Sequence, residues 1–313
     1  MGWKIIHLTR PTKIKVINDN LRLKFKDSNE EIKIVIKDID FILFDNMQFS
    51  ITAKAMHLLA TNNIATLFID EQWTPSAILT PYHQHSTMTN IANTQISVTK
   101  ELKETIWQDI VTSKIHNQAN VLKMFKIESY TKLDIMSHNI KPYDSNNDEA
   151  QSARIYWKSI FNDTSFKRQN SNGKNKDIRN AMLNYGYAII RATMARAVSA
   201  SGLMPVFGIW HQNKFNSFNL VDDLIEPFRA FIDIHIKILL KKHPHIKLID
   251  VDIKREIVSI LSFECVNIKN GTSNISKAID VFVSHYKKSI TNNDSYLMVY
   301  PYINKEYFDH ELI

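Results

Sequence analysis

The sequence predicts an α+β fold, in which a small N-terminal β-rich domain precedes a larger, mostly α-helical domain. Over the first third of the chain, apolar and polar residues alternate with period two, as in strands that bury one face. From about residue 95 the apolar residues recur every three or four positions, which is typical of amphipathic helices. The polar segment 81–86 separates the two patterns, so we expect domains at residues 1–85 and 86–313. A chain of 313 residues is also long enough for about two domains.

The N-terminal domain begins with alternating segments. Leu21, Leu23 and Phe25 alternate with cationic residues, and the isoleucines of 32–36 are spaced in the same way. The turn-forming residues of segment 26–30 lie between these two runs and predict a hairpin. The predicted elements of this domain are strands 21–25, 32–36, 39–44 and 64–69, and a helix 53–60.

The second domain begins with a helical repeat. Val98, Leu102, Ile106 and Ile110 are four residues apart and so share one helix face. Residues 162–177 are rich in Asn, Ser and Lys and predict a loop. The further predicted helices are 149–161, 178–200, 220–240, 256–263 and 275–290.

Charge and cysteine content restrict the function classes. The chain has 39 Lys and Arg against 32 Asp and Glu, a formal net charge of +7, which favours a polyanionic partner such as nucleic acid or an anionic membrane surface. The single cysteine, Cys265, excludes an intrachain disulfide framework and an all-thiolate zinc site, and it fits a reducing cytosol. No apolar run approaches the length of a membrane span or a signal peptide, so we expect a cytoplasmic protein with no membrane partner.

Four residues are candidates for chemistry, and each has an ordinary structural alternative. Glu149 begins a predicted helix, where the helix dipole favours an acid. His211 follows an apolar segment and can be a hydrogen-bonded structural histidine. Asp223 can cap a helix, and Glu226 precedes Pro227 in what can be a first helical turn. Two carboxylates and one imidazole together form a hard donor set, which suits Mg²⁺ or Mn²⁺ better than zinc. Spacing alone does not bring Glu149 near His211.

Positive charge is concentrated near the predicted loop. Lys167 and Arg168 lie in this polar segment and are candidates for contacts with DNA phosphates. A solvated charged face is the alternative for the whole segment 162–197. Arg154 is five residues after Glu149, roughly 140° round the predicted helix, and either contacts DNA near the site or pairs with an acid.

Three phrases together resemble a known family. They are EAQSARIYW from Glu149, GLMPVFGIWH ending at His211, and DLIEPFR from Asp223 to Arg229. They resemble the CRISPR-associated spacer-acquisition integrases, and most closely the members from type II systems. The similarity extends to NAMLNYGY at 180–187 and FIDEQWTP at 68–75, and so covers nearly the whole chain in order. One departure is Ala150, where many members of the family have glycine.

The resemblance implies a metal-dependent DNA endonuclease and integrase of prokaryotic CRISPR immunity. Such an enzyme inserts a short captured duplex into the repeat array, by attack of a 3′-hydroxyl on a phosphodiester. The family's ligands for Mg²⁺ or Mn²⁺ correspond to Glu149, His211 and Glu226 as catalytic residues, and Asp223 matches a further family acid. The resemblance also implies a homodimer whose N-terminal domain makes dimer and partner contacts, a small ferredoxin-like CRISPR-associated partner dimer, and contacts with other type II CRISPR proteins.

Two other functions are compatible with the residues. One is a divalent-metal nuclease that acts on branched DNA outside CRISPR immunity. The other is a non-catalytic architectural protein that binds DNA, in which the three phrases serve only the stability of the fold.

Overall fold

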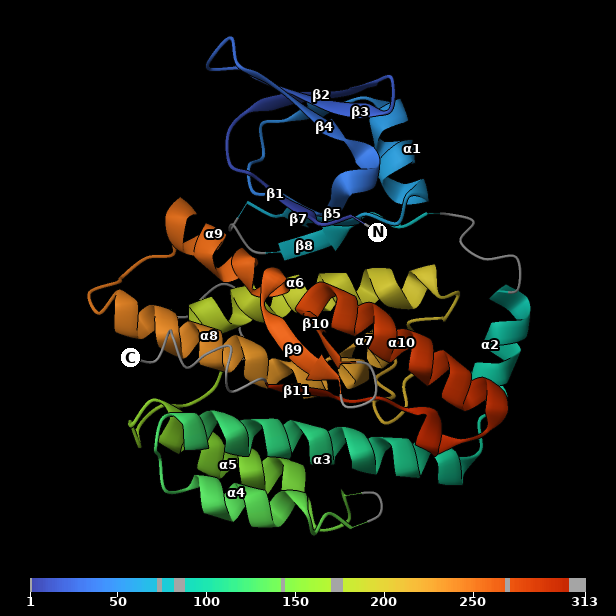
Figure 1. Cartoon of the computed structure of the whole chain (residues 1–313), viewed down its shortest axis with the longest axis vertical. Helices are drawn as coiled ribbons and strands as arrows, with labels where there is room; N and C mark the ends of the chain where they lie inside the picture. The colour runs from blue at the N-terminus through green and yellow to red at the C-terminus, as the bar shows by residue number, and fades with distance from the viewer. Residues whose placement is uncertain are drawn as a thin grey trace. The chain divides into compact units, whose positions relative to one another are not determined.

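The computed structural model describes residues 2–71, 75–81, 88–141, 144–169, 177–267 and 271–303 (Figure 1). Contacts between residues divide the chain into two compact units, residues 1–86 and 87–313. The first unit is rich in strands and the second is mostly helical, which confirms the predicted α+β fold class. Among the described residues, no helix is both long and apolar enough to cross a membrane.

The first unit contains two four-stranded sheets. One has the strand order β1-β5-β7-β8, with the first three strands parallel, and the other has the order β4-β3-β2-β6. The strands are β1 Lys4–Leu8, β2 Thr12–Ile17, β3 Asn20–Phe25, β4 Glu31–Val35, β5 Ile39–Phe44, β6 Ser50–Ile51, β7 Ala65–Ile69 and β8 Pro75–Ile78, with α1 Ala53–Thr61 before β7. Strands β1, β2, β6 and β8 were not predicted.

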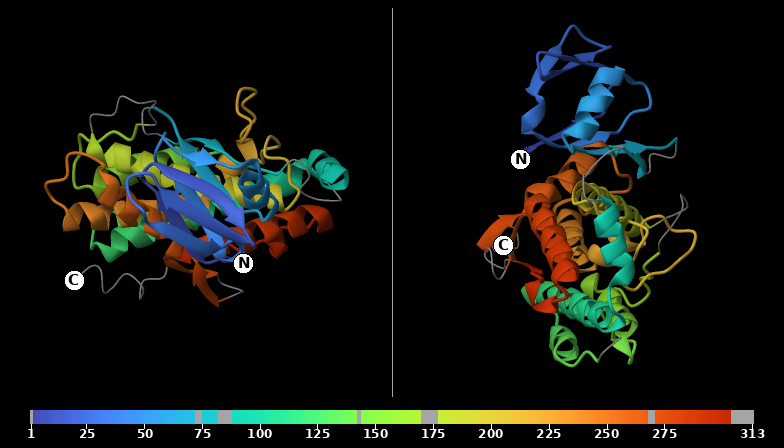
Figure 2. Two further views of the ribbon diagram at one scale, coloured as in Figure 1. Left: turned by 90° about the horizontal axis from the view of Figure 1, so that it is seen from above. Right: turned by 90° about the vertical axis from the view of Figure 1, so that its right-hand side faces the viewer.

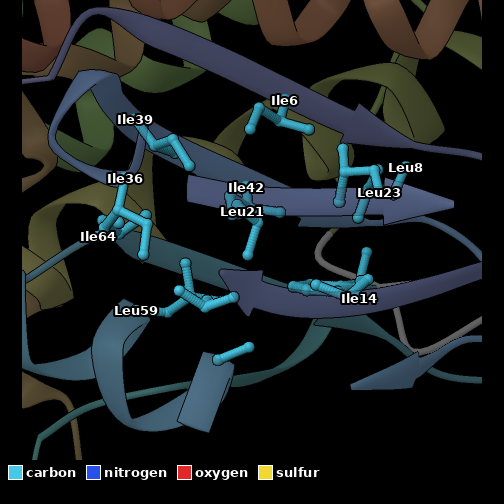
Figure 3. Close-up of a cluster of buried hydrophobic side chains, with 13 residues drawn as sticks. Ile6, Leu8, Ile14, Leu21, Leu23, Ile36, Ile39, Ile42, Leu59 and Ile64 are labelled. Atoms are coloured by element: carbon cyan, nitrogen blue, oxygen red, sulfur yellow. The ribbon is translucent and has the colours of Figure 1, made fainter. Parts of the chain in front are cut away.

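One hydrophobic core joins the two sheets and α1 (Figure 3). Ile14 and Leu23 come from the second sheet, Ile42 from the first, and Leu59 from the helix, and all four are almost fully buried. Leu21 and Leu23 of β3 face this core, as the alternation predicted, and Phe25 is also buried while Lys24 is exposed. Residues 36–38 form a 3₁₀ turn, so the strand predicted over 32–36 ends one residue earlier.

The second unit consists of helices around the central helix α6. Figures 1 and 2 show α6 beside α10, and α6 also contacts α7, α8 and α9. The long helix α3 packs on α4, α5 and α8 and contacts residues 226–228. The helices are α2 Met88–Ser97, α3 Lys100–Met124, α4 Tyr130–Ser137, α5 Asp148–Ile160, α6 Ile178–Ala200, α7 Asn219–Leu224, α8 Arg229–Lys242, α9 Val251–Val258 and α10 Ile275–Asn292.

Three predictions for this unit need correction. The helix predicted over 220–240 is broken between α7 and α8 by the 3₁₀ turn Glu226–Phe228, since Pro227 lacks the N–H that a continuous helix needs. The helix predicted over 256–263 begins earlier, as α9, and ends in the 3₁₀ turn Ser259–Ser262. A three-stranded sheet, β10-β9-β11, was not predicted; its strands are β9 Glu264–Asn267, β10 Gly271–Asn274 and β11 Pro301–Ile303.

Candidate active site

The middle of α3 carries a buried cation. Lys114 is 7% exposed, and its Nζ lies 2.6 Å from Glu149 Oε1 and 2.6 Å from Glu226 Oε2. Burial alone lowers the pKa of Lys114, but the carboxylates of Glu226 and Glu149 outweigh it and raise this pKa above its ordinary value. The lysine therefore stays charged and joins α3 to α5 and to the turn after α7.

Glu149 lies in the first turn of α5, as predicted. The carboxylate of Asp144 accepts hydrogen bonds from the backbone N–H groups of Asp148 and Glu149, at 2.6 and 3.1 Å, and so caps this helix end. The Glu149 side chain is 32% exposed and extends to Lys114. Glu149 thus occupies a first helical turn and also faces the buried cation, and its role in chemistry stays a prediction.

Glu226 is positioned by the break in the helix. It begins the 3₁₀ turn that Pro227 enforces, and its carboxylate is buried against α3. Arg229 Nε donates to Glu226 Oε1 at 2.8 Å, while Oε2 faces Lys114. Burial by itself raises the pKa of Glu226, but the guanidinium of Arg229 and the ammonium of Lys114 lower it to about 2. Glu226 is therefore an anion at any physiological pH.

His211 is held by Asp223 rather than by the acids of the candidate triad. Asp223 is fully buried, and its carboxylate accepts backbone hydrogen bonds from Ile209 at 2.6 Å and Trp210 at 2.9 Å. The same carboxylate bonds to Nδ1 of the His211 ring. This hydrogen bond is the largest of the effects that raise the pKa of His211. With Nδ1 committed to Asp223, Nε2 is the ring nitrogen that can bind a metal ion.

Gly208 allows this loop to close over the aspartate. A Cβ at this position would lie 2.1 Å from the carbonyl oxygen of His211 and 2.9 Å from Asp223 Oδ2. Any larger residue would force the loop away from the carboxylate that orients His211. The glycine three residues before the histidine is therefore a steric requirement of this site.

The predicted residues Glu149 and Glu226 converge, and both contribute electrostatically to the raised pKa of His211. As they lie here, no group of three or more His, Cys, Asp or Glu side chains in the described part of the chain is arranged to hold a metal ion. The Lys114 ammonium occupies the position between the two carboxylates. Because it contacts an oxygen of each, a single cation can bridge the two acids, and the Asp223-oriented His211 adds the usual nitrogen donor. The residues therefore fit a hard divalent ion once Lys114 moves aside.

The candidate DNA contacts lie outside this cluster. Arg154 on α5 and Lys167 are exposed. Arg168 instead turns toward α6, where its guanidinium donates to Asn180 at 3.1 Å and Asn184 at 2.5 Å. These contacts favour a structural role for Arg168.

Much of the predicted basic segment is paired with acids. Lys174 and Lys176 lie outside the described residues. The basic surface expected from the sequence is therefore smaller than the count of cations suggests, because three arginines are neutralised: Arg179 by Asp163 and Asp177, Arg191 by Asp222, and Arg196 by Asp280.

Sequence reasoning missed Lys114. The signal was present, since Lys114 continues the four-residue spacing of Leu102, Ile106 and Ile110 on the apolar face of α3. A cation on an otherwise buried helix face requires a buried anion. Arg229 was noted within a motif but was given no role.

Comparison with known proteins gives the family. The family model described as CRISPR associated protein Cas1 matches residues 6–247. A CRISPR-associated endonuclease Cas1 of Neisseria meningitidis serogroup C is 29% identical over 304 residues, which is 97% of each chain. One from Saccharolobus solfataricus is 29% identical over 215 residues, or 67% of each chain.

Solved structures share the fold. A Cas1 protein from Thermotoga maritima has a TM-score of 0.75 against this chain, with 15% identity over 93% of this chain and 98% of its own. A casposase bound to its integration product has a TM-score of 0.74, with 20% identity over 94% and 92% of the two chains. The family model covers most of the chain, and the resemblance predicted from its three motifs is confirmed. This chain belongs to the Cas1 family of CRISPR-associated proteins.

Proposed function

We propose that this protein is a divalent-metal-dependent DNA endonuclease and integrase of CRISPR immunity, which acts in the prokaryotic cytoplasm. The observation that carries the proposal is the buried Lys114, which two acids from separate elements share beside a histidine oriented by Asp223. The relatives from Neisseria meningitidis and Saccharolobus solfataricus are named as endonucleases, and the structurally similar casposase is described with an integration product. The predicted chemistry, attack of a 3′-hydroxyl on a phosphodiester of the repeat, agrees with both.

The chain's own residues would prepare the site. Glu149, Glu226 and Nε2 of His211 would hold Mg²⁺ or Mn²⁺, while Asp223 fixes the tautomer of His211 and Arg229 keeps Glu226 ionised. When bound, such an ion polarises a phosphoryl oxygen and stabilises the charge on the leaving 3′-oxygen. Lys114 would leave the two carboxylates, and its ammonium would then be close enough to pair with a DNA phosphate.

The partners follow from the family and remain part of this proposal. We expect double-stranded DNA as captured fragment and repeat, a homodimer, and a small CRISPR-associated partner dimer, with contacts from the N-terminal unit and from other type II proteins. A structural neighbour is described as a Cas6-RT-Cas1–Cas2 complex, which supports a Cas2-type partner.

A strand-transfer assay tests the function. The protein and its small partner are mixed with a short duplex, a supercoiled plasmid that carries the repeat, and Mg²⁺ or Mn²⁺ in separate reactions. We expect Glu149→Ala, His211→Ala and Glu226→Ala to abolish integration while they retain DNA binding. The matched controls are Glu128→Ala and His245→Ala, which alter exposed residues of the same types.

Other outcomes would favour the alternatives. Full integration by the three variants would contradict the assignment of the site. Cleavage of branched DNA without integration into the repeat would favour a nuclease outside CRISPR immunity. DNA binding with neither reaction would favour an architectural protein.

A further inference from the structure

A buried asparagine on α3 joins two distant parts of the helical unit. Asn117 is fully buried and lies about one turn along α3 from Lys114. Its Nδ2 donates hydrogen bonds to the carbonyl oxygens of Pro227 and Pro301, each at 3.0 Å. Its Oδ1 accepts a hydrogen bond from the backbone N–H of Ile303 at 3.2 Å. A flipped amide would place its oxygen against two carbonyl oxygens, so these bonds fix the orientation of the carboxamide.

Two of these bonds cover the outer edge of strand β11. In the sheet order β10-β9-β11, β11 pairs with β9 along one edge. Along the other edge, Pro301 presents a carbonyl and Ile303 an N–H, which a further strand would normally bind. Asn117 binds both groups, so its carboxamide takes the place of a peptide group of that further strand. The last described strand is thereby tied to α3, beside which it lies (Figure 1).

The third bond holds the turn that carries Glu226. Lys114 contacts Oε2 of the Glu226 carboxylate, while Asn117 binds the carbonyl of the next residue, Pro227. The contact with Lys114 is lost when a metal ion replaces the ammonium, as proposed above. The bond from Asn117 does not involve the carboxylate and is retained. Asn117 therefore keeps the turn in place while the cation beside Glu226 is exchanged.

We propose that Asn117 is a positioning residue that couples strand β11 to Glu226. The proposal rests on the proposed function, because Glu226 is a ligand of the proposed metal site. One carboxamide binds both β11 and the turn, so a shift of β11 away from α3 would weaken the hold on Pro227. A metal ion that fixes Glu226 would in turn stabilise β11, since coupling between two sites acts in both directions. A partner that displaces β11 would then lower the metal affinity of the site.

Hydrogen–deuterium exchange of the full-length protein tests the link without any reaction on DNA. In EDTA, Asn117→Ala should speed exchange in two separate segments, the turn 225–229 and the strand 301–303. The expected increase is about ten-fold, which corresponds to the loss of a buried hydrogen bond. Asn117→Leu fills a similar volume without hydrogen bonds and should have the same effect. A thermal melt of each variant checks its fold.

The matched control is Asn180→Ala. Asn180 on α6 is equally buried, and its carboxamide also binds backbone groups, the carbonyl of Lys167 and the N–H of Gln169, each at 2.9 Å. Its removal should speed exchange near residues 167–169 and leave the turn and β11 unchanged. The control thus separates the loss of a buried asparagine in general from the loss of this link.

Addition of Mn²⁺ tests the coupling itself. In the wild type, Mn²⁺ should slow exchange in the turn and also in β11, a measurement that needs no variant. In Asn117→Ala it should slow exchange in the turn only. Calorimetric titration should give an affinity for Mn²⁺ about three- to ten-fold lower in Asn117→Ala, a smaller loss than for a residue bonded directly to a ligand. Asn180→Ala should keep the wild-type affinity.

Protection of β11 by Mn²⁺ in the wild type, and its loss in Asn117→Ala, would support the coupling. Protection of the turn without protection of β11 in the wild type would overturn it, and so would equal effects of Asn117→Ala and Asn180→Ala on the turn. If Mn²⁺ protects neither segment, the proposed metal site is rejected. Faster exchange of both segments in metal-free Asn117→Ala would then still support the link, and unchanged exchange would overturn it.

Discussion

Two buried carboxylates of the helical unit meet opposite kinds of partner. Glu226 lies between two cations, Lys114 and Arg229, which lower its pKa to about 2. Asp233, on the next helix, accepts a hydrogen bond from the hydroxyl of Tyr187, and burial raises its pKa to about 6. Arg229 is close to both acids, and its guanidinium lies 4.8 Å from the centre of the Tyr187 ring.

The difference shows which buried acid can exchange its partner. A carboxylate held by cations keeps its charge, so another cation can replace the first at little cost in desolvation. A carboxylate held by a hydroxyl, such as Asp233, responds to pH by taking up a proton when burial outweighs the nearby guanidinium groups, here those of Arg168 and Arg229. Glu226 therefore suits metal chemistry, while Asp233 suits a structural role. The first two of the four predictions below test this contrast, and the other two concern the residues around it.

The largest effect is expected from removal of the shared cation. Lys114→Met leaves Glu149 and the buried Glu226 without the ammonium, which should cost about 3–5 kcal/mol in the free energy of unfolding without metal. Mn²⁺ should then bind at least ten-fold more tightly than to the wild type, because no ammonium competes. Urea denaturation and calorimetric titration measure the two quantities. Lys132→Met, on the exposed face of α4, is the control. Unchanged Mn²⁺ affinity would show that Lys114 does not compete for the carboxylates.

The second prediction concerns Asp233, which accepts a hydrogen bond from the hydroxyl of Tyr187. Its effect on stability should have the opposite pH dependence to that of Glu226. Between pH 4 and 6 the folded chain keeps Asp233 protonated while the unfolded chain loses that proton, so stability falls as the pH rises through this window. Above pH 6 this loss in the free energy of unfolding is complete, and it amounts to no more than about 3 kcal/mol. Glu226 acts in the other direction, because its contribution is lost as the pH falls from 4.5 toward 2.

Asp233→Asn isolates this effect. The difference in the free energy of unfolding between pH 4 and pH 6 should shrink in this variant, by up to the same about 3 kcal/mol. Denaturation at both pH values measures it, with Asp252→Asn as an exposed control. An identical pH profile for wild type and Asp233→Asn would remove the distinction between the two acids.

A smaller effect concerns the aspartate that orients His211. Asp223→Asn should weaken Mn²⁺ binding about 10–100-fold, as losses of such outer carboxylates do. Since Asp223 raises the pKa of His211, the wild type should lose metal affinity as the pH falls through that raised value. In Asp223→Asn this loss should shift to lower pH, which titration across the acidic range measures. A shift to higher pH would contradict the role of Asp223.

The smallest effect on stability is expected at the surface of α5. Arg154→Ala should change the free energy of unfolding by less than about 0.5 kcal/mol, since the side chain is exposed. If Arg154 contacts DNA, the variant should bind duplex more weakly and with a reduced dependence on salt. Lys158→Ala, one turn further along the same helix, is the comparison. Equal DNA affinity in both variants would leave Arg154 without a role in binding.

Local patterns predicted much of the fold. Helix α6 spans 178–200 as expected, because its apolar spacing is long and uninterrupted. The sheet of β9, β10 and β11 escaped prediction because its strands are short, and Ile303 pairs with Cys265 across a large sequence separation. The three-motif resemblance supplied Glu149, His211 and Glu226, which spacing alone could not connect.

The sequence by itself determined the division into β-rich and helical parts and the family, because these depend on periodicity and on motifs. Only the tertiary structure decided that Lys114 lies between Glu149 and Glu226, and that Asp223 orients His211. These contacts depend on the packing of α3 against α5 and the turn that Pro227 imposes. No spacing along one element encodes that convergence, because burial forces charges from distant parts of the chain to find partners in space.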